Sequence, residues 1–260
     1  MNKFLLKALV FASVNIAVFA DAQFRTRNRM DRNESFDQQK VSWGFYLNGN
    51  MLDYHINLNP TYGMDGNTSL VTSKPSYSFG AGLIAKVRIN DNLDLRMEPG
   101  LQFGQRQIVF YTQPNDKYKD GTLTNAPFHP IGLAEKDTHR DIKSTLIDVP
   151  VLIELHGDRW YNSRPYVAAG VNYIVNLQSN SSSTEDNLQG VFRSTTHNFA
   201  WSAEMGIQFY FNKFKLTPAV RGTFFMNNEI VADNATTPPY WTAAMSTLQT
   251  RAVMFVLKFE

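Results

Sequence analysis

The charged side chains are the groups in this 260-residue chain that could do chemistry. Many of them alternate with apolar residues along the sequence. They are Lys86, Arg88, Asp94, Arg96, Glu98, Arg106, Asp148, Glu154, Glu204 and Arg221, with Lys258 near the end of the chain. Successive side chains of a strand point to opposite faces, so these residues would occupy the face that the apolar residues leave free. Acidic and basic groups buried together must pair, because a buried unpaired ion costs several kcal/mol. We therefore interpret the set as a structural network of ion pairs.

A catalytic site is the competing interpretation, and its acid–base group would be one of the five histidines. Asp137 and His139 stand two positions apart and could act together as an acid and a base. A useful hydrogen-bonding geometry would be accidental in so polar a stretch, however. The sequence has no serine nucleophile elbow, phosphate-binding loop, helical pair of metal ligands or cysteine. We predict a protein that is not an enzyme and that holds no cofactor and no metal.

The segment from Tyr77 to Tyr111 indicates which elements carry the charges. Outside its central turn, the odd positions are apolar from Phe79 to Phe103, whereas most of the even positions carry glycine, glutamine or charged residues. Residues 90–92 form a polar turn in the middle, so the pattern predicts two antiparallel strands with one apolar and one polar face. Each strand is ten residues or more, which matches the roughly 9 to 11 tilted residues that cross a bilayer. A hairpin of a soluble β-sandwich is the alternative.

The same alternation recurs along the chain and predicts eight strands. The connections between them alternate between long and short: 59–75, 90–92, 112–140, 157–163, 179–193, 212–213 and 227–246. Short turns on one side and long loops on the other are typical of outer-membrane barrels. We therefore predict an all-β fold, an eight-stranded antiparallel transmembrane β-barrel built as an up-and-down meander, with short periplasmic turns and long extracellular loops.

The N-terminal region predicts export. Residues 1–22 combine a basic start, an apolar run and an A-x-A site, which is the pattern of a signal peptide cleaved near Ala22. Residues 23–40 are polar and lack an apolar period, so we expect a flexible periplasmic tail before the barrel of residues 41–260. With 25 basic and 23 acidic residues, the chain has no charge excess that would indicate a nucleic-acid partner. We expect it in the outer membrane of a Gram-negative bacterium.

Two further features concern the regularity of the strands and the interior of the predicted barrel. Pro99, Pro150 and Pro218 fall inside predicted strands and remove ladder donors, so we expect a bulge or a local register break at each. The interior of an eight-stranded barrel is also just wide enough for side chains to fill. The charged set would then plug the barrel, and we expect no pore.

Three segments of the predicted strands carry a family resemblance: I-D-V-P-V-L-I-E-L from Ile147, R-P-Y-V-A-A-G-V from Arg164 and T-R-A-V-M-F-V-L-K-F-E from Thr250. With these segments the chain resembles the PorT and SprT family of outer-membrane β-barrel proteins from Bacteroidetes. The resemblance implies a component of the type IX secretion system, needed to export proteins with a C-terminal sorting domain and, in some species, for gliding motility. It implies outer-membrane lipid, other secretion components and the barrel assembly machinery as partners. It supplies no catalytic residue.

Two other functions fit the same pattern. One is a passive small barrel, such as an adhesin or an envelope-stabilising protein. The other is an outer-membrane hydrolase or acyltransferase, for which His139 would be the residue to test.

Overall fold

The computed structural model describes residues 37–60, 63–65, 68–110, 139–184, 191–233 and 242–260. The expected signal peptide, most of the expected tail and Asp137 lie outside these ranges. Among the described residues, no helix has the length and apolar character needed to cross a membrane.

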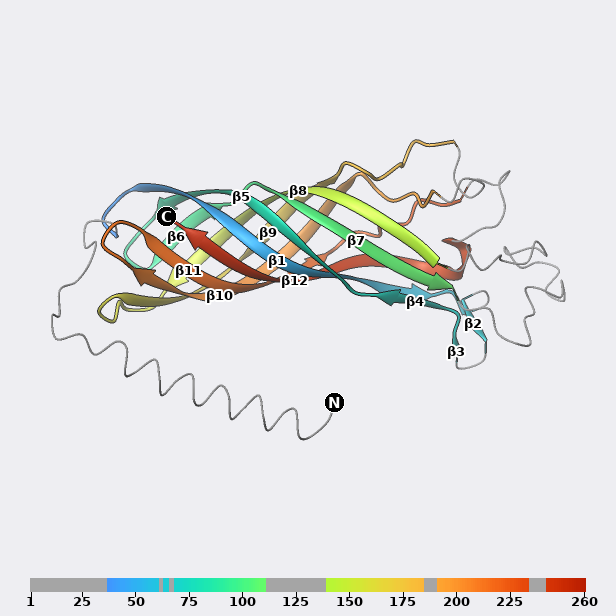
Figure 1. Ribbon diagram of the computed structural model, residues 1–260, viewed down its shortest axis with the longest axis horizontal. Coiled ribbons are helices and arrows are strands. Elements are labelled where there is room, and N and C mark those ends of the chain that lie inside the picture. Colours follow the sequence, from blue (N-terminus) through green and yellow to red (C-terminus); the bar gives the residue numbers. More distant parts are fainter. Residues whose placement is uncertain (1–36, 61–62, 66–67, 111–138, 185–190, 234–241) are drawn as a thin grey trace, which may run out of the picture. The chain divides into compact units, whose positions relative to one another are not determined.

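The described chain is an antiparallel β-meander that closes on itself (Figure 1). Its long strands are β1 (Val41–Leu58), β5 (Ser76–Arg88), β6 (Leu93–Met97), β7 (Gly100–Phe110), β8 (His139–His156), β9 (Ser163–Asn176), β10 (His197–Tyr210), β11 (Lys215–Phe225) and β12 (Met245–Phe259). Shorter elements are β2 (Met64–Asp65), β3 (Thr68–Ser69), β4 (Val71–Lys74) and the 3₁₀ turn η3 (Thr242–Ala244). Because β6 and β7 are two parts of one traverse and β1 pairs with both β5 and β12, the strands form a closed barrel. The predicted fold class is confirmed.

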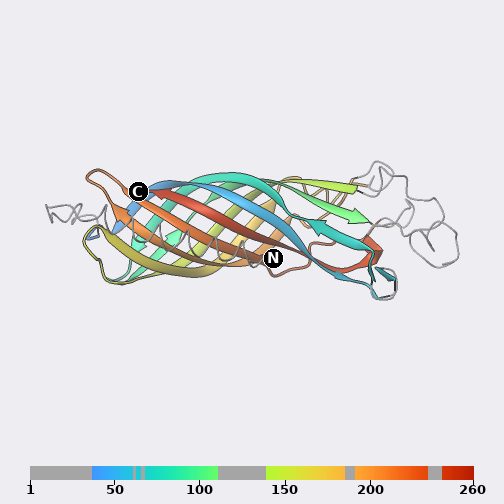
Figure 2. The ribbon, with the colours of Figure 1, turned by 60° about the horizontal axis from the view of Figure 1, so that its bottom comes forward.

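The two ends of the barrel differ. The turns between β5 and β6, β8 and β9, and β10 and β11 are short, and the C-terminus lies at the same end, which we call the short-turn end (Figure 1). The opposite end, the long-loop end, carries the connections that follow β1, β7, β9 and β11. Figure 2 shows the strands inclined to the long axis of the barrel, as closure of a sheet requires.

A belt of large apolar side chains covers the outside of the barrel. Leu83, Val171, Met205, Val220 and Phe255 are at least half exposed and belong to five different strands. The alternation that the sequence shows thus directs apolar residues outward, the reverse of a soluble sheet packed on a core. Lipid is the medium in which such a surface is stable.

The outward positions become polar toward the long-loop end. On β8, His139, Asp141 and Lys143 point outward and are exposed, and Arg251 does the same on β12. β8 has 18 residues, more than the roughly 9 to 11 that cross a bilayer. The barrel therefore continues beyond its apolar belt.

Exposed aromatic residues gather at the margins of the belt. At the short-turn end they include Trp160, Tyr161 and the stacked rings of Phe211 and Phe214. Toward the long-loop end lie Tyr173, Phe199 and Trp201, with Trp201 stacked on Phe224. Amphipathic rings favour the level of the lipid headgroups, so the two bands fit a barrel that spans one bilayer.

The interior is layered along the axis. A cluster of apolar side chains occupies the long-loop end: Tyr54, Val71, Ile108, Phe110, Ile142, Phe192, Ala244, Met245 and Leu248. Hydrogen-bonded polar residues fill the middle, such as Asn172, which donates to Asp148 at 2.8 Å and accepts from Ser202 at 2.7 Å. Charged residues fill the short-turn end.

Glycine makes room for large side chains in this narrow interior. Tyr46 of β1 lies over Gly82 and Gly100, which face each other on β5 and β7. A Cβ atom added at Gly100 would overlap the Tyr46 hydroxyl. Tyr166 covers Gly206 of β10 in the same way. The small residues thus fix where the two buried tyrosines lie.

The expected register breaks at Pro99, Pro150 and Pro218 are wrong. Ala85 faces Met97 and Gly82 faces Gly100, so the register of β5 is the same on both sides of Pro99. Pro150 faces Asn172, and Pro218 faces Leu257, within ladders of constant register. The ladder is merely interrupted at Pro99 and, toward β10, beside Pro218. The long flanking ladders hold the register, so each proline costs hydrogen bonds without shifting its strand.

The orientation of the belt can be tested with one charged substitution. Val220 lies near the middle of the outward face of β11, and Val220→Lys should destabilise the folded barrel by about 2–4 kcal/mol. The matched control is Ser246→Lys, at an exposed position of β12 beyond the belt, which should change the stability by less than about 0.5 kcal/mol. Urea unfolding in lipid vesicles measures both. Equal costs for the two variants would contradict the proposed lipid level.

Candidate functional site: the charge network inside the barrel

The centre of the network is a pair of buried carboxylates that share three cations. Glu204 of β10 faces Arg221 of β11 in register and lies 2.5 Å from it. Arg96 of β6 reaches the same carboxylate at 2.5 Å and Glu98 at 2.7 Å. Lys258 of β12 contacts Glu98 at 2.9 Å and also pairs with Glu204. Residues from opposite sides of the barrel thus meet on its axis.

Further contacts tie this centre to the barrel wall. Arg221 also pairs with Glu98, and Arg96 also pairs with Glu154. Tyr166 donates its hydroxyl to Glu204 at 2.6 Å, and Gln208 donates to Glu154 at 2.7 Å. The network is therefore connected through hydrogen bonds as well as charge, which is the condition for tolerating buried ions.

A second group lies nearer the short-turn end. Lys86 of β5 is 3.4 Å from Asp94 and 3.7 Å from the side chain of Glu260. Glu260 also pairs with Lys215 at the start of β11. His156, the last residue of β8, places Nε2 2.7 Å from Asp94.

The charged side chains of these two groups are equal in number. Five basic side chains, Lys86, Arg96, Lys215, Arg221 and Lys258, meet five acidic ones, Asp94, Glu98, Glu154, Glu204 and Glu260. Burial alone would raise the pKa of Glu260, which follows the last strand, but Lys215 and Lys86 hold that pKa well below its ordinary value. The carboxylate is therefore ionised at neutral pH.

Three of the ten charged residues predicted from the sequence lie elsewhere. Arg88 pairs with Asp91 in the exposed turn after β5. Asp148 is hydrogen-bonded to Asn172 in the middle layer. Arg106 lies toward the long-loop end, where it bonds Ser144 and Thr250, stacks on Tyr54 at 4.4 Å and lies 3.6 Å from Glu229. The other seven take part in the two groups described above.

Sequence reasoning missed several members of the network. Lys215 and Glu260 stand at the ends of their strands, where the alternation stops giving a direction. Glu229 lies in the loop after β11, and no periodicity marks it. His156 had a usable signal, because Glu154 and His156 are two positions apart on one strand and must share a face.

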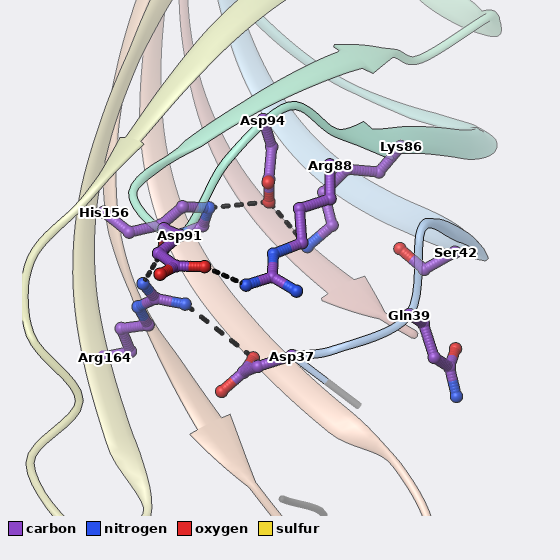
Figure 3. A pocket seen from close by; sticks show the side chains of 9 residues that line it. All are labelled: Asp37, Gln39, Ser42, Lys86, Arg88, Asp91, Asp94, His156 and Arg164. Atoms are coloured by element: carbon purple, nitrogen blue, oxygen red, sulfur yellow. Dashed lines mark hydrogen bonds and ion pairs between the residues drawn. The ribbon is translucent and has the colours of Figure 1, made fainter. Parts of the chain in front are cut away.

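A small pocket opens beside Asp94 and His156 (Figure 3). Its remaining lining residues are Asp37, Gln39, Ser42, Lys86, Arg88, Asp91 and Arg164. Its free volume of about 10 Å³ is close to what one water molecule requires. The charge network is thus reached by solvent from the short-turn end.

His139, the candidate acid–base residue, lies at the first position of β8 and is exposed. It is at the long-loop end, away from the network, and its proposed partner Asp137 is outside the described residues. The geometry adds nothing to the case for a catalytic pair there.

Comparison with known proteins agrees with the fold. A family model described as an outer membrane protein beta-barrel domain matches residues 19–231. The chain belongs to this family. Its site is therefore the interior of an outer-membrane barrel, whose apolar belt lies in the lipid of that membrane. No curated protein matches the chain.

Solved structures with a similar fold include three outer-membrane barrels. Neisserial surface protein A is 11% identical, with 85% of this chain and 98% of that chain covered, at a TM-score of 0.37. OprG from Pseudomonas aeruginosa is 14% identical, with 85% and 95% covered, at 0.40. Ail of Yersinia pestis, in complex with the heparin analogue sucrose octasulfate, is 7% identical, with 85% and 99% covered, at 0.35.

The interdependence of the buried charges can be tested by a double-mutant cycle. Glu204→Gln removes a negative charge that Arg96, Arg221 and Lys258 share. It should therefore lower the free energy of unfolding by about 3–5 kcal/mol. Adding Arg221→Gln should recover only part of this loss, because Glu98 then loses a partner. Urea unfolding of both single variants and the double variant gives the coupling, expected at about 0.5–3 kcal/mol. Strict additivity would show that the two charges do not interact.

Proposed function

We propose that this outer-membrane barrel does not conduct, does not catalyse a reaction, and acts through its surfaces as a component of protein secretion. The proposal that the barrel does not conduct rests on its filled interior. No side chain of Arg96, Glu98, Glu154, Glu204, Arg221 or Lys258 is more than 2% exposed. A hydrated path through this layer would have to separate several of the ion pairs at once.

A second barrier supports the same conclusion. At the long-loop end, Glu229 is 1% exposed, accepts a hydrogen bond from the Thr250 backbone at 2.6 Å and lies near Arg106. Burial raises the pKa of Glu229, although Arg106 and Thr250 oppose the shift. The apolar cluster around Phe110 and Leu248 surrounds this contact. The interior is thus packed at both ends, which suits an anchor better than a channel.

A role in the type IX secretion system is supported by the resemblance of three strand segments, which begin at Ile147, Arg164 and Thr250, to the PorT and SprT family. Such a component would contact its partners at the periplasmic face, where the described chain begins. Asp37 is fixed there by Arg159 at 3.1 Å and by the Tyr210 hydroxyl at 2.7 Å. Asp37 is therefore a fixed point at the short-turn end. Other secretion components and the barrel assembly machinery are the partners we propose.

A passive barrel, either an adhesin or an envelope-stabilising protein, is the second candidate. The observation that favours it is the part of the barrel beyond the apolar belt, where His139, Asp141, Lys143 and Arg251 form a polar outer surface. This surface stands outside the lipid and could bind a partner without any secretion machinery.

The absence of conduction is tested in planar lipid bilayers. The purified full-length protein should give no steady single-channel current, because the charged layer and the apolar layer both close the interior. A porin of known conductance, inserted in the same bilayer, serves as the positive control. Open channels of a defined size would refute the non-conducting barrel.

The secretion role is tested by deleting the gene and comparing proteins with C-terminal sorting domains in the culture supernatant and the periplasm. We expect such proteins to disappear from the supernatant and to accumulate in the periplasm, with recovery when the gene is restored on a plasmid. Normal export in the deletion strain, together with loss of binding at the cell surface, would favour the passive barrel instead.

A further inference from the structure

Three potential metal ligands converge at the short-turn end of the barrel. Asp94 of β6 faces Glu154 of β8 in register, and His156 follows on the same face of β8. Nε2 of His156 lies 2.7 Å from Asp94 and 3.2 Å from Glu154, and the three ligand atoms all lie within 4.8 Å of one another. Ligands about 2.0–2.2 Å from a tetrahedral zinc ion are roughly 3.3–3.6 Å apart. Small movements would therefore bring these atoms to bonding distance of one ion.

We propose that Asp94, Glu154 and His156 form a binding site for a divalent transition-metal ion of the Zn²⁺ type. One imidazole nitrogen with two carboxylates is a ligand set that such ions accept, whereas Ca²⁺ and Mg²⁺ are bound mainly by oxygen. Two of the ligands are cross-strand neighbours and the third is two residues away, so the backbone ladder itself holds the set together. The proposal does not depend on a role in secretion.

The direction of the His156 ring is a second observation that points to a ligand. The side chain is 2% exposed, and Nε2 is directed at the carboxylates of Asp94 and Glu154. Nε2 can give only one proton to the two carboxylates, whereas a metal ion would bind all three groups at once.

The pocket provides an entry path and a further ligand position. Figure 3 shows Asp94 and His156 side by side at its edge, with Lys86 approaching Asp94 from β5. The pocket has room for about one water molecule, which could complete a fourth coordination position. An ion would reach the site from the periplasm without crossing the ion-pair network.

Lys86 is the competitor for this site. Its ammonium lies 3.4 Å from Asp94 and so supplies the positive charge that a metal ion would otherwise provide. It can move toward Glu260, which is 3.7 Å away, when an ion binds. Arg96 pairs with Glu154 and reduces the negative charge available to a metal ion. Removing the charge of Lys86 should therefore strengthen metal binding, and removing His156 should weaken it.

Opposite effects of two neighbouring variants give a sharp test. Untagged full-length protein in detergent is titrated with Zn²⁺ by calorimetry and with Co²⁺ by visible absorption, which reports the coordination geometry. The wild type should bind one equivalent. His156→Ala and His156→Gln should each weaken the affinity for the metal by at least about tenfold. Loss of a residue that merely orients a ligand already weakens metal affinity by about 10–100-fold. Lys86→Met should strengthen binding several-fold.

The matched control is His197→Ala, which removes an exposed histidine at the long-loop end and should leave the affinity unchanged. Circular dichroism checks that each variant retains its β-sheet, and Lys86→Gln replaces Lys86→Met if the latter does not fold. Three results would each overturn the site: no saturable binding by the wild type, equal affinity in the wild type and both His156 variants, or no gain when the charge at position 86 is removed.

Discussion

The pairing of charges inside a closed sheet is the constraint on which the rest of this structure depends. An eight-traverse barrel in lipid must direct apolar residues outward, so its polar residues face a narrow interior with no room for bulk water. Arg96 and Arg221, both fully buried, would be intolerable there without Glu98 and Glu204. The geometry of the interior follows from this need: glycines at 82, 100 and 206 admit the buried tyrosines, and the space that remains is filled by ion pairs.

The two ends of the interior solve the same packing problem differently. At the short-turn end, charges fill the space and a small pocket admits solvent beside Asp94 and His156. At the long-loop end, apolar residues including Phe110 and Leu248 fill it, although the outer surface there is already polar. Beyond the lipid the barrel thus resembles a soluble β-protein, with an apolar inside and a polar outside. The sense of the alternation reverses along a single strand such as β8, where Ile142 is buried and Ile153 is exposed.

Alternation and loop length were enough to predict the fold from the sequence, because both are local properties of the chain. The partners of the buried charges were not predictable, since Arg96 and Glu204 are 108 positions apart and meet only after closure. Prolines misled the prediction for a related reason. Pro150 has no N–H to donate to Glu98. The Glu98 N–H still donates to the Pro150 carbonyl oxygen at 3.2 Å, and the neighbouring residue pairs keep the register. The hydrogen bonds of two long ladders fix the register more strongly than one proline disturbs it.

The last strand connects closure of the barrel to neutralisation of its charges. β12 pairs with β1 and β11, and it carries Lys258 and precedes Glu260. Lys258 is a cation of the central group, and Glu260 is the carboxylate that pairs with Lys86 and Lys215. Until β12 is in place, Glu98 and Glu204 lack the partner Lys258, and Lys86 and Lys215 lack the partner Glu260. Because hydrogen bonding of the edge strands and pairing of the ions are completed by the same step, a barrel that is open between β1 and β12 is disfavoured twice. The C-terminal strand therefore stabilises both the wall of the barrel and its interior.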